Sequence, residues 1–172
     1  RQWLDALSTC GFKLWQMCPT GPTGYGDSPY QCFSAFAGNP YFIDWDAVVE
    51  AGYLKAAQLE PLTRLPNDSV DYGALFERFW PIIEKAFQNF KSQLEHSDSL
   101  RKKVESFYAA EESWLYDYCN FRALKERYKQ KATAEWPSEN RNKAALGKNT
   151  EKQFISESAE KHAFTQYLFF KQ

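Results

Sequence analysis

The stretch from Tyr25 to Gln31 gathers side chains that could bind a sugar ring. Two tyrosines, Tyr25 and Tyr30, stand there beside the carboxylate of Asp27, the hydroxyl of Ser28 and the amide of Gln31. A carbohydrate presents an apolar face of C–H groups and a rim of hydroxyls, so an aromatic face with polar partners is the set that recognises it. The surrounding letters, GPTGYGDSPYQ, contain three glycines and two prolines. The glycines and prolines would fix the backbone that carries these side chains and so lower the entropy lost when a ligand binds.

Three other interpretations compete for the same loop. A phosphate-binding loop would need a Gly-Lys-Ser/Thr end or the glycine spacing of a dinucleotide fold, and neither is present. A serine nucleophile at a tight turn would need Gly-x-Ser-x-Gly, whereas Ser28 stands in Asp-Ser-Pro. The third interpretation is a rigid turn whose tyrosines only pack. From the residues alone, the rigid turn and the sugar-binding loop are equally supported.

A helix and a strand are predicted just before this loop. Residues 1–11 carry Trp3, Leu4 and Leu7 on one helical face and end on a glycine, as helices commonly do. The apolar run FKLWQMCP, at 12–19, predicts a short strand. A helix followed by a strand indicates half of a βαβ unit and hence a parallel sheet, in which ligand residues occupy loops at the carboxyl ends of strands. The loop stands in that place.

Further along, the sequence predicts helices. A short one is expected in DWDAVVEAGYL, and apolar residues recur at helical spacing in 71–94, 99–131 and 150–172. Pro81 would bend or restart the first of these long helices. The pattern thus gives about five helices and one strand. Because one strand leaves its backbone groups unpaired, and because both ends of the chain fall within amphipathic patterns, we expect the neighbouring strands beyond this sequence.

Charge and composition argue against several partners. The chain of 172 residues carries 21 basic and 22 acidic side chains, which gives no reason to expect nucleic acid or an anionic membrane as a partner. No run is apolar enough to span a bilayer, and no signal peptide is visible. The four cysteines lack the spacing of metal ligands and are expected to be buried free thiols, which fits a reducing compartment.

The segment WQMCPTGPTGYGDSPYQCFSAFAGNPYFID resembles the signature region of the 4-α-glucanotransferases, also called amylomaltases or disproportionating enzymes (glycoside hydrolase family 77). Four further stretches resemble the family in the expected order. They are VDYGALFERFWPIIEKAF, WLYDYCNFRALKERY, the Trp136-Pro137 step and HAFTQYLFFKQ. The resemblance therefore covers essentially the whole chain.

The resemblance implies an α/β fold, a (β/α)8 barrel with helical insertions, of which this chain is an N-proximal and predominantly α piece. Residues 1–45 would supply the first barrel helix, the second strand and a glucan-binding loop. Residues 46–148 would form a helical insertion, and residues 149–172 a helix that returns to the barrel. The rest of the barrel is then an expected partner of this chain.

The resemblance also implies a retaining glycosyl transfer on α-1,4-glucans and maltooligosaccharides, in the cytoplasm, with neither a metal nor an organic cofactor. Such a mechanism needs two carboxyl groups about 5–5.5 Å apart. In the family these groups lie on later strands, in motifs such as Arg-x-Asp-His, and no such motif occurs in this sequence. No catalytic residue is therefore assigned, and the chain alone is expected to be inactive.

Family positions that bind glucan fall on two parts of the chain. The matching residues are Tyr25, Asp27, Ser28, Tyr30, Gln31 and Tyr72. In the family, the positions of Ser28 and Tyr30 contact the sugar near the donor subsites. The position of Tyr25 is implicated in glucan binding along the acceptor side or at an accessory site. The positions of Asp27 and Gln31 either have a structural role or bind glucan. Tyr72, in VDYG, matches a second aromatic residue of the family that stacks on glucan.

Two functions of other kinds compete with the transferase. The chain could be a non-catalytic helical module that binds glucan or a protein partner. It could also belong to an endo-acting hydrolase of the same clan, which would release reducing ends without lengthening any chain.

Overall fold

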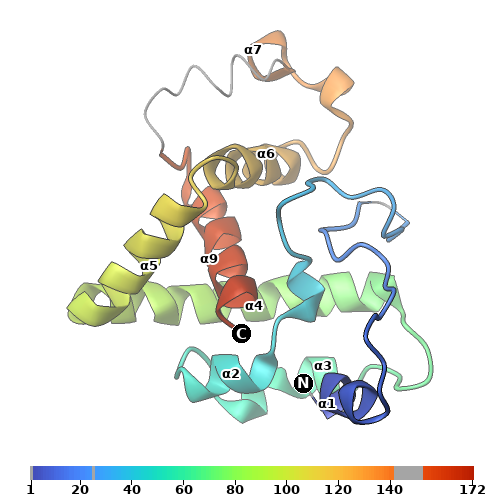
Figure 1. Ribbon diagram of the computed structural model, residues 1–172. Helices are drawn as coiled ribbons and strands as arrows, with labels where there is room; N and C mark the ends of the chain where they lie inside the picture. Colours follow the sequence, from blue (N-terminus) through green and yellow to red (C-terminus); the bar gives the residue numbers. More distant parts are fainter. Residues whose placement is uncertain (1, 25, 142–152) are drawn as a thin grey trace.

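Helices dominate the computed structural model, which describes residues 2–24, 26–141 and 153–172 (Figure 1). The predominantly α character expected from the sequence is confirmed. In chain order the elements are α1 (Gln2–Thr9), the 3-10 turn η1 (Pro40–Phe42), α2 (Trp45–Glu50), η2 (Ala56–Leu59), α3 (Glu60–Thr63), α4 (Tyr72–His96), α5 (Asp98–Ala110), α6 (Leu115–Arg127), η3 (Thr133–Glu135), α7 (Ser138–Arg141) and α9 (Glu157–Lys171).

The starts of the long helices are fixed by capping side chains. Asp71 precedes α4, and its carboxylate accepts a hydrogen bond from the amide of Ala74, 2.9 Å away. The hydroxyls of Ser97 and Ser156 accept in the same way at the starts of α5 and α9. Each cap satisfies a backbone N–H that the first turn of a helix leaves unpaired. These residues explain why the helices begin where they do.

α4 runs through Pro81 as one helix. The prediction that the helix would restart at this proline is wrong. Phe79, Ile82 and Ile83 lie on either side of it and are all buried in the same core. Burying three such side chains is worth about 1.5–3 kcal/mol each, which outweighs the cost of about 3 kcal/mol for a proline inside a helix.

α9 lies between α4 and α6 and is buried along most of its length (Figure 1). Toward α4, Phe164 stacks on Phe90 with the ring centroids 4.6 Å apart. Toward α6, the fully buried Ala159 and Ala163 belong to a second core that includes α6 residues. Since small side chains at positions i and i+4 allow two helices to approach closely, these alanines seat α6 against α9.

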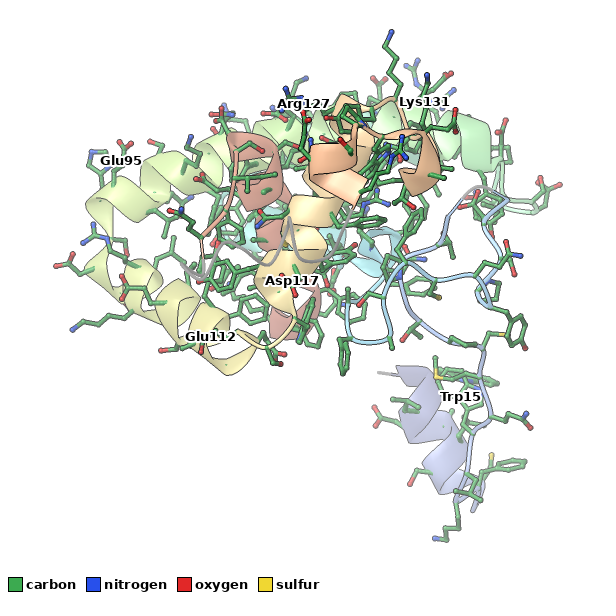
Figure 2. All side chains as sticks on the ribbon, turned by 90° about the horizontal axis from the view of Figure 1, so that it is seen from above. Trp15, Glu95, Glu112, Asp117, Arg127 and Lys131 are labelled. Atoms are coloured by element: carbon green, nitrogen blue, oxygen red, sulfur yellow. The ribbon has the colours of Figure 1, made fainter. Side chains whose placement is uncertain are left out.

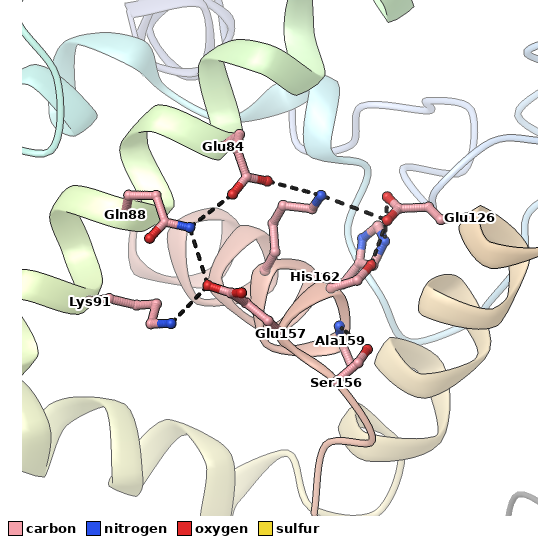
Figure 3. A network of polar contacts seen from close by, with 10 residues as sticks. Glu84, Gln88, Lys91, Glu126, Ser156, Glu157, Ala159 and His162 are labelled. Carbon is pink, nitrogen blue, oxygen red and sulfur yellow. Dashed lines mark hydrogen bonds and ion pairs between the residues drawn. The ribbon is translucent and has the colours of Figure 1, made fainter.

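A polar network ties α6 to α9 and α4 (Figure 3). The Glu126 carboxylate lies 3.0 Å from Nε2 of buried His162, accepts a hydrogen bond from Ser158, and lies 3.7 Å from the Lys161 ammonium, which also lies 3.2 Å from Glu84. Burial lowers the pKa of His162 to about 4, although the nearby carboxylate opposes it. Burial raises the pKa of Glu126, but its contacts with the imidazole, the hydroxyl and the ammonium bring it down to about 2. At neutral pH the histidine is therefore neutral and the glutamate ionised.

The strand predicted at 12–19 is not formed, which corrects the sequence-based expectation. A strand is stabilised by backbone pairing with a neighbour, and the described ranges contain no strand that could pair with it. The only β pairing among the described residues is an isolated bridge between Thr23 and Cys32. In Figure 2, Trp15 lies on an N-terminal segment that projects away from the helical body. The large apolar side chains of this segment are exposed, namely Phe12, Leu14, Trp15 and Met17.

The helix predicted at 1–11 is present as α1, and Gly11 behind it has a φ of 82°, as expected of a residue that ends a helix. By contrast, residues 99–131, one helical segment by their pattern, form two helices. The turn between α5 and α6 is closed by Trp114, whose Nε1 donates a hydrogen bond to the Glu111 carboxylate over 2.6 Å. Burial of this indole in the second core decides the break.

The described residues also bear on the other sequence expectations. Cys119 is a buried free thiol as predicted, whereas Cys10 and Cys18 are exposed, which corrects the prediction for them. Within the described ranges, no three His, Cys, Asp or Glu side chains are grouped so that they could hold a metal ion. None of the helices described here combines the length and apolar character needed to cross a membrane.

Candidate functional site

The stretch 20–39 folds back on itself. The Phe33 amide donates a hydrogen bond to the Pro22 carbonyl over 3.0 Å, next to the bridge between Thr23 and Cys32. Further out, the Asn39 amide donates to a carbonyl at the start of the stretch over 2.8 Å. These bonds close a compact loop at 20–33, which we call the 20–33 loop, and hold its two arms side by side.

The tip of the 20–33 loop turns through left-handed backbone. Gly26 has a φ of 86° and Asp27 a φ of 50°. Glycine adopts this region without penalty, and aspartate tolerates it better than most residues. The Asp27 carboxylate also accepts a hydrogen bond from the Thr23 hydroxyl over 3.0 Å. The glycines and the aspartate of the motif therefore shape a specific turn.

A cavity of about 870 Å³ lies between this loop, α4 and α6. Its volume is within the range of small-molecule sites in proteins. On the α4 side, Tyr72, Phe76 and Trp80 line it. Since they follow one another at intervals of four residues, they lie along one face of the helix and give the cavity an aromatic wall.

α6 supplies the opposite wall with polar side chains. Tyr118, Arg122 and Lys125 line the cavity and stand at positions i, i+4 and i+7 of one helical face. Phe33 of the 20–33 loop packs against this wall. The Arg122 Cζ lies 4.9 Å, and the Lys125 Nζ 5.5 Å, from the centroid of its ring, which is cation–π distance. The contacts of this ring with both cations hold the loop against α6.

Tyr41 also lines the cavity, and its hydroxyl is influenced by the charges of both Asp27 and Arg122. Burial and the Asp27 carboxylate raise the pKa of Tyr41 to about 12, although the Arg122 guanidinium lowers it. The Tyr41 hydroxyl is therefore protonated and can donate a hydrogen bond. Aromatic faces, a carboxylate, amides and hydroxyls converge on one space, as sugar recognition requires.

The structure brings three of the predicted site residues together at this cavity. Asp27 and Gln31 line it from the 20–33 loop, and Tyr72 lines it from the first turn of α4. Tyr72 lies far from the other two in the sequence, so the fold, not the motif, joins them. Tyr25 lies outside the described residues.

The other two predicted residues, Ser28 and Tyr30, do not line the cavity. The Ser28 hydroxyl accepts a hydrogen bond from the Tyr30 amide over 3.4 Å, and its carbonyl accepts one from the amide of Gln31 over 3.1 Å. The Tyr30 side chain is 77% exposed, and its hydroxyl lies 3.7 Å from the Cys18 sulfur, a contact that raises the pKa of the tyrosine. Tyr30 is therefore open to solvent, whereas Ser28 is half-buried within the loop.

Several wall residues were not predicted from the sequence. Phe76 and Trp80 stand in the helix predicted at 71–94, and Arg122 and Lys125 stand in the segment predicted at 99–131, without any sign of a binding role. The one available signal was the spacing of Tyr118, Arg122 and Lys125 on one face of a segment that is otherwise apolar there.

The model of the 4-alpha-glucanotransferase family matches residues 1–172. The chain belongs to this family. A 4-alpha-glucanotransferase of Thermus thermophilus is 41% identical over 172 residues, which are all of this chain and 33% of that protein. One of Clostridium butyricum is 39% identical over 176 residues, covering 99% of this chain and 34% of the relative. The chain thus spans about a third of the length of these relatives.

A solved structure of the 4-alpha-glucanotransferase family has a similar fold. It is an amylomaltase from Streptococcus agalactiae in complex with acarbose, with a TM-score of 0.81 and 34% sequence identity over 99% of this chain and 34% of that chain. The helical arrangement described above is therefore that of the family, and the resemblance read from the motifs is confirmed.

Proposed function

We propose that the protein to which this chain belongs is a 4-α-glucanotransferase that moves α-1,4-glucan segments between maltooligosaccharide or starch chains by a retaining double displacement. In this proposal the reaction takes place in the cytoplasm and uses neither a metal nor an organic cofactor, and this chain contributes substrate binding. One observation carries the proposal. In a chain of this family, the cavity joins the 20–33 loop to the aromatic wall of α4.

The walls of the cavity suit a glucan. Tyr72, Phe76 and Trp80 would stack on the apolar faces of successive glucose units, while Asp27 and Gln31 would bond their hydroxyls. The complex of the similar amylomaltase with acarbose supports a sugar as the ligand class.

Ser28 and Tyr30 are proposed to contact the glucan from the face of the 20–33 loop that does not line the cavity, and Tyr25 is proposed as a further glucan contact. The exposure of Tyr30 leaves its ring available to a chain that approaches from there. In the complete protein, Ser28 and Tyr30 would lie near the donor subsites.

The division of the chain is also a proposal. Residues 1–45 would belong to a (β/α)8 barrel, 46–148 to a helical insertion, and 149–172 to a helix that returns to the barrel. The exposed apolar residues at 12–17 support this division, because they would be covered by other barrel elements. The catalytic carboxylates are proposed to lie outside these 172 residues.

Maltotriose provides the test, with a family-length protein that carries this chain. We expect glucose and longer maltooligosaccharides as products, and we expect Tyr30→Ala to reduce turnover or raise KM. A Tyr30→Ala protein with unchanged turnover and KM would remove that residue from the site. Release of reducing ends without any longer chains would identify the hydrolase instead.

The second candidate is a non-catalytic helical module that binds glucan or a protein. It is favoured by the observation that the described residues alone build two buried cores and the cavity. The two candidates differ in the family-length protein, where the module binds maltooligosaccharides without transferring them. Transfer by the 172-residue chain alone would contradict both the module and the proposal that the carboxylates lie elsewhere.

A further inference from the structure

We propose that the α6 wall of the cavity is an anion-binding site, and that its ligand is a glucose unit carrying a phosphate ester. The inference rests on the proposed function, since the same cavity would hold the sugar ring. It assigns a role to the polar side chains of α6 that a neutral glucan does not require.

Arg122 is the centre of this site. Its side chain is almost fully buried, with 7% of the residue exposed, and its Nε has no hydrogen-bond partner within the described ranges. Among the described residues, the salt bridges do not include Arg122. A buried guanidinium without a counter-ion is unfavourable, so a bound anion at this point would remove an existing cost.

The carboxylates nearest to Arg122 either contact other groups or form no ion pair with it in the described part of the chain. Asp27 accepts the Thr23 hydroxyl, and Glu126 contacts His162 and lies near an α9 ammonium. Glu77 lines the cavity from α4 but forms no ion pair with Arg122 in the described part of the chain. The guanidinium therefore keeps the capacity to bind an oxyanion.

Tyr118 supplies a second unsatisfied group, one helical turn away. Its hydroxyl is buried and finds no hydrogen-bond partner in the part of the chain that the structure describes. Burial raises the pKa of Tyr118, and the Arg122 charge opposes this effect, as expected if the two groups are close. Two orphaned donors on one helical face, both lining the same cavity, form a prepared site for an acceptor.

Lys125 adds a further positive charge on this face. Its ammonium donates hydrogen bonds to the carbonyls of Gln130 and Lys131, each over 2.9 Å, so one of its three protons remains. The planar fork of Arg122 matches phosphate geometry, while the lysine acts as a point charge. A phosphoryl group is therefore the anion that fits best.

The size of the cavity favours a phosphate that is attached to a sugar. A volume of about 870 Å³ exceeds what a free oxyanion fills, and the remaining walls carry the aromatic rings of α4. Free inorganic phosphate shares the same chemistry at the α6 wall and is the alternative source of the anion.

Calorimetric titration of the family-length protein that carries this chain, at constant ionic strength, tests this inference. The ligands are glucose 6-phosphate, glucose, inorganic phosphate and maltoheptaose. We expect glucose 6-phosphate to bind about tenfold or more tightly than glucose, as charge-assisted hydrogen bonds would provide. Arg122→Met should abolish the difference, and Tyr118→Phe, which removes only a hydroxyl, should reduce it. Arg127→Met is the matched control, because Arg127 is exposed on the same helix.

The outcomes separate the possibilities. No preference for glucose 6-phosphate, or a preference that survives both Arg122→Met and Tyr118→Phe, overturns the site. If circular dichroism shows that Arg122→Met does not fold, Tyr118→Phe decides. A further outcome is that inorganic phosphate binds as tightly as glucose 6-phosphate in an Arg122-dependent manner. That result would overturn the sugar phosphate as the ligand and identify free phosphate instead. Maltoheptaose binding without a phosphate preference overturns this inference and leaves the proposed function standing.

Discussion

Gly38 sets the distance between α9 and the chain that follows the 20–33 loop. Its amide donates to Oε1 of the buried Gln166 over 2.8 Å, and its carbonyl accepts from Nε2 of the same side chain over 3.0 Å. A Cβ at this position would lie 2.2 Å from the Phe169 ring. We therefore expect Gly38→Ala to lower the free energy of unfolding by about 1–3 kcal/mol, as overpacking does, measured by urea denaturation.

A double variant checks the cause of this loss. Phe169→Ala removes the ring that the new methyl group would meet. The Gly38→Ala/Phe169→Ala protein should lose less stability than the sum of the two single changes. Simple additivity would show that the glycine is needed for another reason.

Tyr72 was predicted to bind glucan from its family motif, and the structure places it in the wall of the cavity. It lines the cavity, and its ring is 45% exposed and accessible to a ligand. Loss of an aromatic contact is worth about 0.5–1.5 kcal/mol. In the family-length protein, Tyr72→Ala should raise KM for maltoheptaose several-fold, and Tyr72→Phe should leave it close to the original value. An unchanged KM in Tyr72→Ala would mean that the tyrosine only packs.

At the scale of the helices, the contact between α6 and α9 depends on the protonation of His162. Its pKa is lowered from 6.5 to about 4 in the folded chain, mainly by burial. The unfolded chain therefore binds a proton between these values that the folded chain does not, so stability rises with pH across this window and is lost as pH falls. The effect is at most about 3 kcal/mol.

His162→Gln removes the titration while keeping a neutral polar side chain. Thermal or urea unfolding between pH 4 and 7 should show a shallower loss of stability on acidification in this variant. The Glu126 contribution, which belongs to the range from 4.5 down to about 2, should shrink because the imidazole helps to lower that pKa, while Ser158 and Lys161 should retain part of it. Parallel curves for the two proteins would contradict the account of this histidine.

Helices were predictable because their signals are local. The spacing of apolar residues and the caps at Asp71 and Ser97 are visible in the sequence. The strand at 12–19 was not predictable in the same way, since a strand depends on partners that the segment does not contain. The continuity of α4 through Pro81 likewise depends on packing against other elements.

The candidate site was predictable only on the side of the 20–33 loop. A dense motif marked Asp27 and Gln31, and the resemblance added Tyr72. The spacing of Tyr118, Arg122 and Lys125 was the one local signal of the α6 wall, but the burial of these residues depends on how α9 packs against that helix. Arg122 in particular looks like an ordinary surface charge until the fold buries it.

At the scale of the whole molecule, the N-terminal segment gathers exposed large apolar side chains within a short stretch of sequence. Trp3, Phe12, Leu14 and Trp15 are all exposed. Patches of this kind promote association. We expect the 172-residue chain to self-associate at micromolar concentration, and the triple change of Phe12, Leu14 and Trp15 to serine to shift it toward monomer in sedimentation velocity. An unchanged distribution would assign the association to another surface.

Titration of the 172-residue chain with maltoheptaose tests the central claim most directly, namely that this part of the protein holds the glucan. Our account predicts saturable binding, which weakens in Tyr72→Ala and is retained in Arg127→Met, without any transfer products in the same solution. The absence of binding by a chain that circular dichroism shows to be folded would contradict it.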